Sequence, residues 1–143
     1  MRFRSIVLFS ALPACLTGLA YEAFLGHRHD YSGHYLAGYG ATFAAAIAVL
    51  GMIPARNYQR WANRGALPFC CACILGGVVT EATVFRLARF DEVDFFNQSL
   101  GAVLATVCAG AYVGHRKCTP GTIMFGLMTG LTFLWMGGIL AFS

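Results

Sequence analysis

The sequence predicts an all-α integral-membrane bundle of five transmembrane helices, and two observations carry this prediction. Of the 143 residues, 58% are hydrophobic and only 11% are charged, with a mean hydropathy of +0.65. Because soluble domains carry about 25% charged residues, this composition excludes an ordinary water-soluble domain. The apolar residues also gather in five runs, each close to the roughly 20 residues that a helix needs to cross a bilayer.

The first run, Ser5–Leu25, follows two arginines and is predicted to be a retained transmembrane helix. Within it, Leu12-Pro-Ala-Cys15 loosely resembles a lipoprotein cleavage site. A lipid-modified mature protein would continue with a polar tether, whereas here the apolar run continues past Cys15. We therefore expect a spanning helix here.

Four further runs follow: Tyr35–Ile53, Leu67–Leu87, Phe95–Gly114 and Thr122–Phe142. The connections between them are short and leave no room for a soluble domain. Residues 1–143 are therefore expected to form a single transmembrane domain.

The charged residues predict the orientation of this bundle. Seven of the ten basic residues fall on one side of it: Arg2, Arg4, Arg56, Arg60, Arg64, Arg116 and Lys117. All six acidic residues fall towards the other side, with Arg28, Arg86 and Arg89: Glu22, Asp30, Glu81, Asp91, Glu92 and Asp94. The positive-inside rule then puts the N-terminus inside and the C-terminus outside. The inner cations are expected to meet anionic membrane lipids, so the net charge of +4 indicates topology and not a nucleic-acid partner.

One face of each of the first four predicted helices carries small residues that lead to a polar residue at the outer end. These faces are Ala11, Cys15, Gly18 and Glu22; His34, Gly38, Ala41 and Ala45; Cys70, Cys73, Gly77 and Glu81; and Asp94, Gln98, Gly101, Ala105 and Cys108. Small residues let helices approach closely, and polar groups turn away from lipid. The faces therefore predict a common axis that opens outwards, unless they reflect only the 17 glycines and the many alanines of the chain.

Glu81 lies 14 residues beyond Leu67, or about 21 Å along its helix, and therefore inside the hydrocarbon depth. A carboxylate there must face the bundle, find a partner or be neutral. We expect Glu81, Asp94 and Gln98 to form one polar network with Arg89 as its counter-charge. The role of Glu81 is left open between a structural hydrogen-bonding group and a functional acid.

The acidic turn after Glu81 carries a family resemblance. Asp91 and Asp94 form an Asp-x-x-Asp pair, and Gly101 follows in the next helix. Together with Glu81, this arrangement resembles the VanZ-like family over about residues 81–105. The opening of the second span at His34 is also similar to relatives, one residue out of step. Val84, Gln98 and Ala105 depart from the family pattern.

The resemblance implies a multi-pass envelope protein in a bacterial plasma membrane, and the namesake of the family is associated with teicoplanin resistance. A polar pocket inside the membrane suits an amphiphilic or lipid-linked ligand. The residues expected to form it are Glu22, His34, Glu81, Arg89, Asp91, Asp94, Gln98 and Gly101. No catalytic motif is recognised in the chain, so enzymatic activity is not predicted, and neither is a cofactor.

A histidine-rich segment supports a different interpretation. His27, His29, Asp30 and His34 bring three imidazoles and a carboxylate together, and these residue types bind zinc and similar ions. Their spacing is irregular, and Arg28 opposes a bound cation. The alternative function is therefore a metal- or proton-coupled transporter, or a redox-complex subunit, that uses Glu81 and this segment.

Two Gly-x-x-x-Gly pairs, Gly110 with Gly114 and Gly126 with Gly130, suit close packing between helices or between protomers. A homo-oligomer is therefore a further expectation. The cysteines, spread through the predicted spans and the inner side, do not form a disulfide framework, and packing is their expected role.

Overall fold

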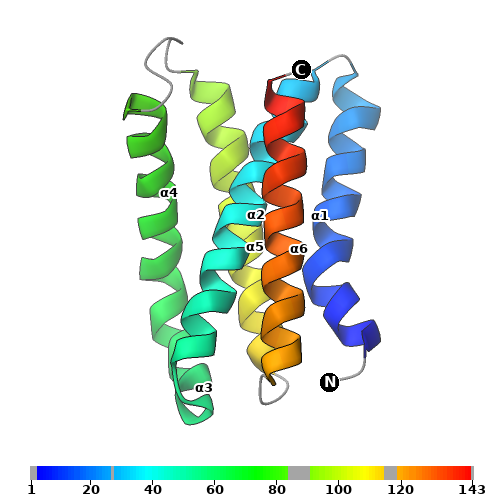
Figure 1. Cartoon of the computed structure of the whole chain (residues 1–143). Coiled ribbons are helices and arrows are strands. Elements are labelled where there is room, and N and C mark those ends of the chain that lie inside the picture. Colours follow the sequence, from blue (N-terminus) through cyan, green and yellow to red (C-terminus); the bar gives the residue numbers. More distant parts are fainter. Residues whose placement is uncertain (1–2, 27, 84–90, 115–118, 143) are drawn as a thin grey trace.

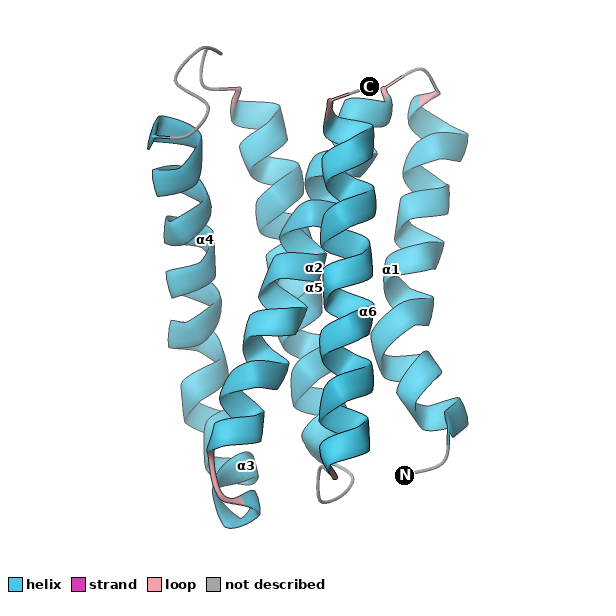
Figure 2. Cartoon of the chain, in the orientation of Figure 1, coloured by secondary structure: helices cyan, strands magenta, loops and turns pink. Residues whose placement is uncertain are grey.

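The computed structural model describes residues 3–26, 28–83, 91–114 and 119–142. Within these ranges the chain is all-helical, without strands, as predicted (Figure 2). The long helices are α1 (Phe3–Leu25), α2 (His29–Met52), α4 (Ala66–Thr83), α5 (Glu92–Gly114) and α6 (Pro120–Ala141). A short 3₁₀ turn η1 (Ala55–Asn57), α3 (Tyr58–Arg60) and the π-helical turn η2 (Trp61–Gly65) lead into α4.

Among the residues that the structure describes, four segments are long and apolar enough to cross a membrane: Val7–Leu25, His29–Met52, Ala55–Thr80 and Pro120–Ala141. The prediction of apolar spanning helices is thus confirmed for four of the five. The helix α5 is not among these four, and Asp94, Asn97 and Gln98 lower the hydropathy of its first turns.

Several helices begin earlier than the hydropathy predicted, and polar side-chain caps are present at the starts of α5 and α6. α5 begins at Glu92, where Oδ1 of Asp91 accepts hydrogen bonds from the amide of Val93 at 2.8 Å and from the amide of Asp94 at 3.4 Å. α6 begins at Pro120, where Thr119 and Thr122 form a capping box. α2 begins at His29, six residues before the predicted Tyr35.

The central helix of the bundle is α2. Of its apolar window, 56% is buried inside the protein, compared with 22% or less for the other three spanning candidates. It packs mainly against α6 and α5, whereas α4 packs mainly against α5. α2 runs obliquely, from beside α3 at one end towards α1 at the other, so it diverges from α4 (Figure 1).

Glycines bring α2 and α6 into backbone contact. A Cβ atom at Gly40 would lie 2.5 Å from the carbonyl oxygen of Gly130, and one at Gly137 would lie 2.7 Å from that of Gly33. Gly126 lies instead against a side chain, because a Cβ atom there would be 3.1 Å from Cγ1 of Ile47. The Gly126-x-x-x-Gly130 pair therefore packs α6 against α2 of the same chain, by the close approach that small residues allow.

Buried tyrosines join neighbouring helices of the bundle. Tyr39 is fully buried, and its hydroxyl donates a hydrogen bond to the carbonyl of Ser10 on α1 at 2.6 Å. Its ring also meets Phe133 of α6 edge-on, with 5.7 Å between ring centroids. On α5, the buried hydroxyl of Tyr112 donates to the carbonyl of Thr122 at 2.7 Å. These bonds satisfy polar hydroxyls that have no access to water.

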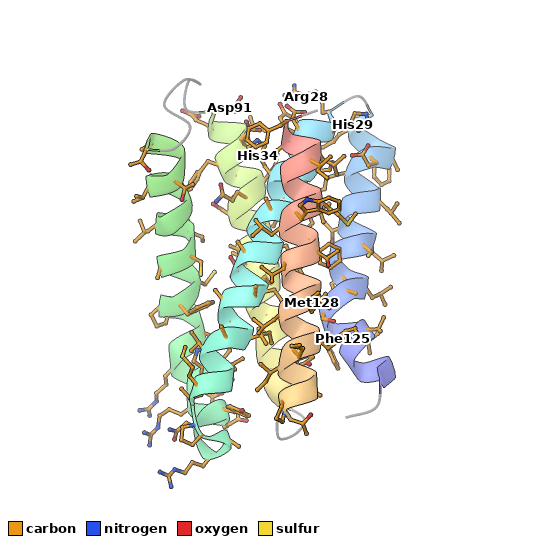
Figure 3. All side chains as sticks on the ribbon, in the orientation of Figure 1. Arg28, His29, His34, Asp91, Phe125 and Met128 are labelled. Carbon is orange, nitrogen blue, oxygen red and sulfur yellow. The ribbon has the colours of Figure 1, made fainter. Side chains whose placement is uncertain are left out.

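The exterior is apolar along the helices and charged at the ends (Figure 3). Leu19, Leu75, Val107 and Trp135 are more than half exposed on four different helices. Such extensive apolar exposure is a liability in water and is the expected surface of a protein surrounded by lipid.

Two ends of the bundle can be distinguished. The basic end carries the exposed Arg56, Arg60 and Arg64. The acidic end carries Asp30, Asp91, Glu92 and Asp94 from α2 and α5, together with Arg28 (Figure 3). The two termini lie at opposite ends, the N-terminus at the basic end and the C-terminus at the acidic end (Figure 1).

Candidate functional site

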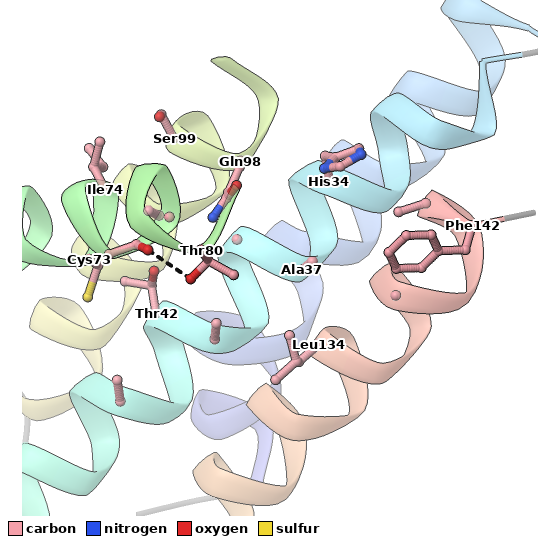
Figure 4. A pocket seen from close by; sticks show the side chains of 18 residues that line it. His34, Ala37, Thr42, Cys73, Ile74, Thr80, Gln98, Ser99, Leu134 and Phe142 are labelled. Carbon is pink, nitrogen blue, oxygen red and sulfur yellow. Dashed lines mark hydrogen bonds between the residues drawn. The ribbon is translucent and has the colours of Figure 1, made fainter. Parts of the chain in front are cut away.

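A cavity of about 530 Å³ lies in the half of the bundle nearer the acidic end, among α2, α4, α5 and α6 (Figure 4). It occupies the space that opens where α2 leans away from α4. Small residues leave this volume unfilled: Ala37, Gly38, Ala41 and Ala45 of α2, Gly76 and Gly77 of α4, and Gly138 and Ala141 of α6.

Gln98 of α5 extends into the cavity towards α4 (Figure 4). Its position depends on Gly77, because a Cβ atom at that residue would overlap Nε2 of Gln98 and lie 3.0 Å from its Cδ. On the other side, a Cβ atom at Gly38 would lie 2.9 Å from the carbonyl carbon of Gln98. Gly38 therefore lets the backbone of α5 approach α2 at Gln98, and Gly77 leaves room for the side-chain amide of Gln98 beside α4.

Polar side chains gather where the cavity approaches the acidic end. Nε2 of His34 lies 3.5 Å from Oδ2 of Asp94, an ion pair whenever the imidazole is protonated. Both side chains are about one fifth exposed, at 20% and 22%. Within the described part of the chain, neither Oδ1 of Asp94 nor Oγ of Ser99 has a hydrogen-bond partner. Buried oxygens without partners are costly. Ser99 lines the cavity, whereas Asp94 lies behind His34 and does not line it.

Glu22 lies apart from the cavity, between α1 and α2. Its Oε1 accepts a hydrogen bond from the hydroxyl of Ser32 at 2.5 Å, and its Oε2 lies 2.7 Å from Nδ1 of His29. The neighbouring Gly18 packs against Leu36. The predicted common axis of four helices is thus wrong for α1, because the intervening α2 separates α1 from the cavity.

The other three predicted faces contribute unequally. All four residues of the α2 face line the cavity, as do Cys73 and Gly77 from α4 and Gln98 from α5. Gly101 does not line it. A Cβ atom there would lie 2.7 Å from the amide nitrogen of Tyr39, so this glycine serves the contact between α5 and α2.

The predicted network around Glu81 is described only in part. The backbone of Glu81 belongs to α4, but its side chain and the whole of Arg89 lie outside the described residues. Asp94 and Gln98 do share one face of α5, with Asp94 beside His34 and Gln98 in the cavity. Asp91 caps α5 through its side chain. The network itself stays a prediction.

The described members of the histidine segment do not converge on one point. His29 contacts Glu22, and His34 contacts Asp94. Asp30 accepts two hydrogen bonds from Arg28, and this bonding raises the pKa of the Arg28 guanidinium. No group of three or more His, Cys, Asp or Glu residues that could hold a metal ion occurs among the residues that the structure describes, which exclude His27.

The sequence reasoning missed the contribution of α6 to the cavity. Leu134, Gly138 and Ala141 line it from that helix, with Phe142 beyond the helix end. Their i, i+4, i+7 spacing places the three residues on one face of α6. The sequence contains this spacing, but the face has no polar residue of the kind that marked the other predicted faces. Asn97 was also missed, although it is only 4% exposed and its Oδ1 accepts a hydrogen bond from Tyr21 at 3.0 Å.

Comparisons of the chain with protein-family models, with curated proteins and with solved structures found no match. The function therefore has to be argued from the site itself.

Proposed function

We propose that the chain crosses the membrane five times, with α5 as the remaining span. Support comes from the two faces of α5. Its exposed face is apolar and carries Phe96, Leu100, Val103 and Val107 at helical spacing. The amide of Asn97 is buried and the side chain of Gln98 turns into the cavity, so the residues that lower the hydropathy of α5 avoid lipid.

The proposed orientation has the basic end inside and the acidic end outside. Arg56, Arg60 and Arg64 are exposed at the basic end, close to the short helix α3. Retention of positively charged loops on the cytoplasmic side favours this orientation. The cavity would then lie in the outer half of the membrane.

The function we propose is binding of an amphiphilic or lipid-linked ligand in this cavity. The observation that carries the proposal is the cavity of about 530 Å³, within the range of roughly 300–1,000 Å³ typical of ligand sites. Alanines, glycines, Ile74 and Leu134 supply apolar walls for a hydrocarbon tail, whereas His34 and Gln98 supply polar groups for a head.

Native mass spectrometry of the purified protein tests this proposal directly. The wild-type protein is expected to retain a non-covalently bound amphiphile, identified by its mass after release. Ala41→Leu fills the cavity and should abolish retention, whereas Ala72→Leu changes an exposed alanine of α4 that does not line it. Absence of any bound amphiphile from the wild-type protein, or equal retention by both variants, would contradict the proposal.

The VanZ-like resemblance extends the proposal to an envelope protein that affects susceptibility to lipophilic glycopeptides. One residue that matches the family pattern supports this link, because Asp94 lies beside His34, which lines the cavity. Drug sensitivity of cells with and without the gene is the measurement. Unchanged sensitivity together with unchanged envelope-lipid composition would remove this part of the proposal.

One observation favours the alternative of a proton-coupled transporter. His34 and Asp94 form a partly buried acid–base pair between α2 and α5, and these residue types form proton relays in membrane transporters. The metal-coupled and redox versions have no comparable support among the described side chains. Elemental analysis and a visible absorption spectrum test these two versions. Stoichiometric metal in the purified protein would favour the metal-coupled transporter over ligand binding, and a haem band would favour the redox subunit.

A further inference from the structure

We propose that the cavity opens sideways to the bilayer between α4 and α6, and that a single hydrocarbon chain of a membrane lipid enters through this opening and lies along α2. This inference rests on the proposed function and deepens it, because it names the part of the ligand that the cavity binds and the route by which that part enters.

The helices that border the cavity leave one of its sides uncovered. Among the described elements, α4 packs against α5 and more weakly against α2, whereas α6 packs against α2 and α1. α4 and α6 therefore lie on either side of α2 without substantial contact with each other (Figure 1). Part of α2 is left uncovered between them, although α2 is the most buried of the four spanning segments.

The exposed residues of the cavity wall locate the opening. Ala41 and Ala45 of α2 line the cavity and are exposed, whereas the neighbouring Ala44 and Ala46 are buried. Ala41 lies about 18 Å from the first residue of α2, near the middle of the helix. In a chain that crosses the membrane, an opening at this depth meets hydrocarbon and not water.

The two edges of the opening belong to α4 and α6. Gly76 and Thr80 of α4 and Leu134 of α6 line the cavity and are exposed at the same time. Thr80 and Leu134 stand on opposite sides of α2 (Figure 4). The hydroxyl of Thr80 donates to the carbonyl of Gly76 at 2.8 Å, so it is satisfied within its own helix. Both edges are therefore compatible with contact with lipid.

The dimensions of the cavity match one lipid chain. Its wall on α2 extends from His34 to Ala45, or about 17 Å along the helix. The hydrocarbon core of a bilayer is roughly 30 Å thick, so the chains of one leaflet span about 15 Å. A methylene group is about as large as a water molecule, which takes roughly 30 Å³, so 530 Å³ holds about 18 such groups. The cavity therefore accommodates one chain of a common membrane lipid and not two.

Polarity along the cavity gives the direction of this chain. His34 and Gln98 line the part nearer the acidic end, whereas Ala41 and Ala45 lie nearer the membrane centre (Figure 4). A lipid of the leaflet at the acidic end therefore enters with the methyl end of its chain towards Ala45 and with its head group towards the acidic end.

A chain in the cavity supplies contacts that an empty cavity lacks. Atoms that line a void have no partners on one side and forfeit dispersion energy. Alanine and glycine side chains offer no hydrogen bonds to ordered water, so water is a poor substitute along these walls. A chain from the adjacent leaflet restores the missing contacts without passing through an aqueous phase.

Photolabelling by lipid chains provides the test. The protein is reconstituted in phosphatidylcholine vesicles that contain a phosphatidylcholine with a diazirine in one chain, and tandem mass spectrometry locates the adducts. We expect adducts at Ala41 and Ala45 but not at the buried Ala44 and Ala46. Leu75 is exposed on α4 and does not line the cavity, so its adducts are the positive control for contact with lipid.

Two probe lipids report the direction of the chain. One carries the diazirine near the methyl end of the chain and the other near the carboxyl end. The first should label Ala45 in preference to Ala37, which lies about 12 Å away along α2, and the second should reverse this preference. The same ratio of adducts with both probes would show that the chain does not lie along α2.

A pair of leucine variants separates a chain inside the cavity from lipid around the protein. Ala41→Leu places its side chain in the cavity and should lower the adducts at Ala45 at least about tenfold, the factor that corresponds to the usual cost of overpacking. Ala72→Leu changes an exposed alanine of α4 that does not line the cavity and should leave them unchanged. Labelling of Leu75 should be the same in both variants.

The outcomes distinguish this inference from the proposed function. Labelling of Leu75 without labelling of Ala41 and Ala45 would show that the cavity is closed to the bilayer. Equal labelling of Ala45 in both leucine variants would show that its adducts do not come from a chain in the cavity. Either result overturns the sideways entry of a lipid chain. The proposed function survives both results if native mass spectrometry still shows an amphiphile that Ala41→Leu releases.

Discussion

Replacing Gly137 by alanine should force α6 away from α2, because the glycine lies against the backbone of the other helix. A Cβ atom at this position would overlap the amide nitrogen of Ala37 and would lie 2.7 Å from the carbonyl oxygen of Gly33. Neither neighbour is the end of a flexible side chain. The new methyl group can therefore be accommodated only by movement of a whole helix.

The size of the effect follows from this geometry. Relief of the overlap needs a separation of about 1 Å at the contact, since carbon atoms pack at roughly 3.5–4.0 Å. A gap of this size removes a quarter to a half of the dispersion energy of each affected atom pair. The α2–α6 contact is the most extensive in the bundle. We expect a loss of about 1–3 kcal/mol, the usual cost of overpacking a core.

Gly138→Ala is a matched control on the next residue of the same helix, where a Cβ atom would meet nothing within 4 Å. The two variants share the same change in helix propensity, so their difference reports packing alone. The free energy of unfolding is measured by reversible titration of the protein from mild detergent into dodecyl sulfate. Gly137→Ala should be less stable than Gly138→Ala by about 2 kcal/mol. Equal stabilities would refute the backbone contact between α2 and α6.

Three further predictions concern orientation and local contacts. In a protein without its native cysteines, an impermeant thiol reagent outside intact cells should label Glu92→Cys and not Arg60→Cys; the reverse pattern would invert the proposed orientation. Gly77→Ala should displace the side-chain amide of Gln98 and weaken ligand retention in native mass spectrometry. The free energy of unfolding should change by less than about 1 kcal/mol, because the flexible Gln98 side chain can move. Tyr39→Phe should lower the free energy of unfolding by about 0.5–1.5 kcal/mol, because it removes an interhelical hydrogen bond of 2.6 Å; an unchanged value would show that this bond contributes nothing.

The sequence predicted the helices better than the site. The run from Thr122 to Phe142 corresponds to α6 within two residues at each end, because hydropathy and a Thr-Pro cap are local signals. The histidine segment shows the opposite case. His29 and His34 are five residues apart in the chain, yet they contact carboxylates on α1 and α5. Their partners depend on which helices surround the start of α2, and no local pattern contains that information.

The expected site residues had different outcomes for one reason. His34 lines the cavity, whereas Glu22 lies on the other side of α2, although both stood at the polar ends of similar small-residue faces. Glycine and alanine recur on every helix, so spacing alone does not identify the neighbour that a face meets.

The sequence by itself determined that the chain forms long apolar helices with opposite charge at their two ends. Hydropathy suffices for this because a helix satisfies its own backbone hydrogen bonds in lipid, independently of its neighbours. Only the tertiary structure decided that α2 is central, that Gly137 and not Gly138 contacts it, and that a cavity lies among α2, α4, α5 and α6. These features depend on the relative tilt and rotation of whole helices, which the summed packing of many distant side chains selects.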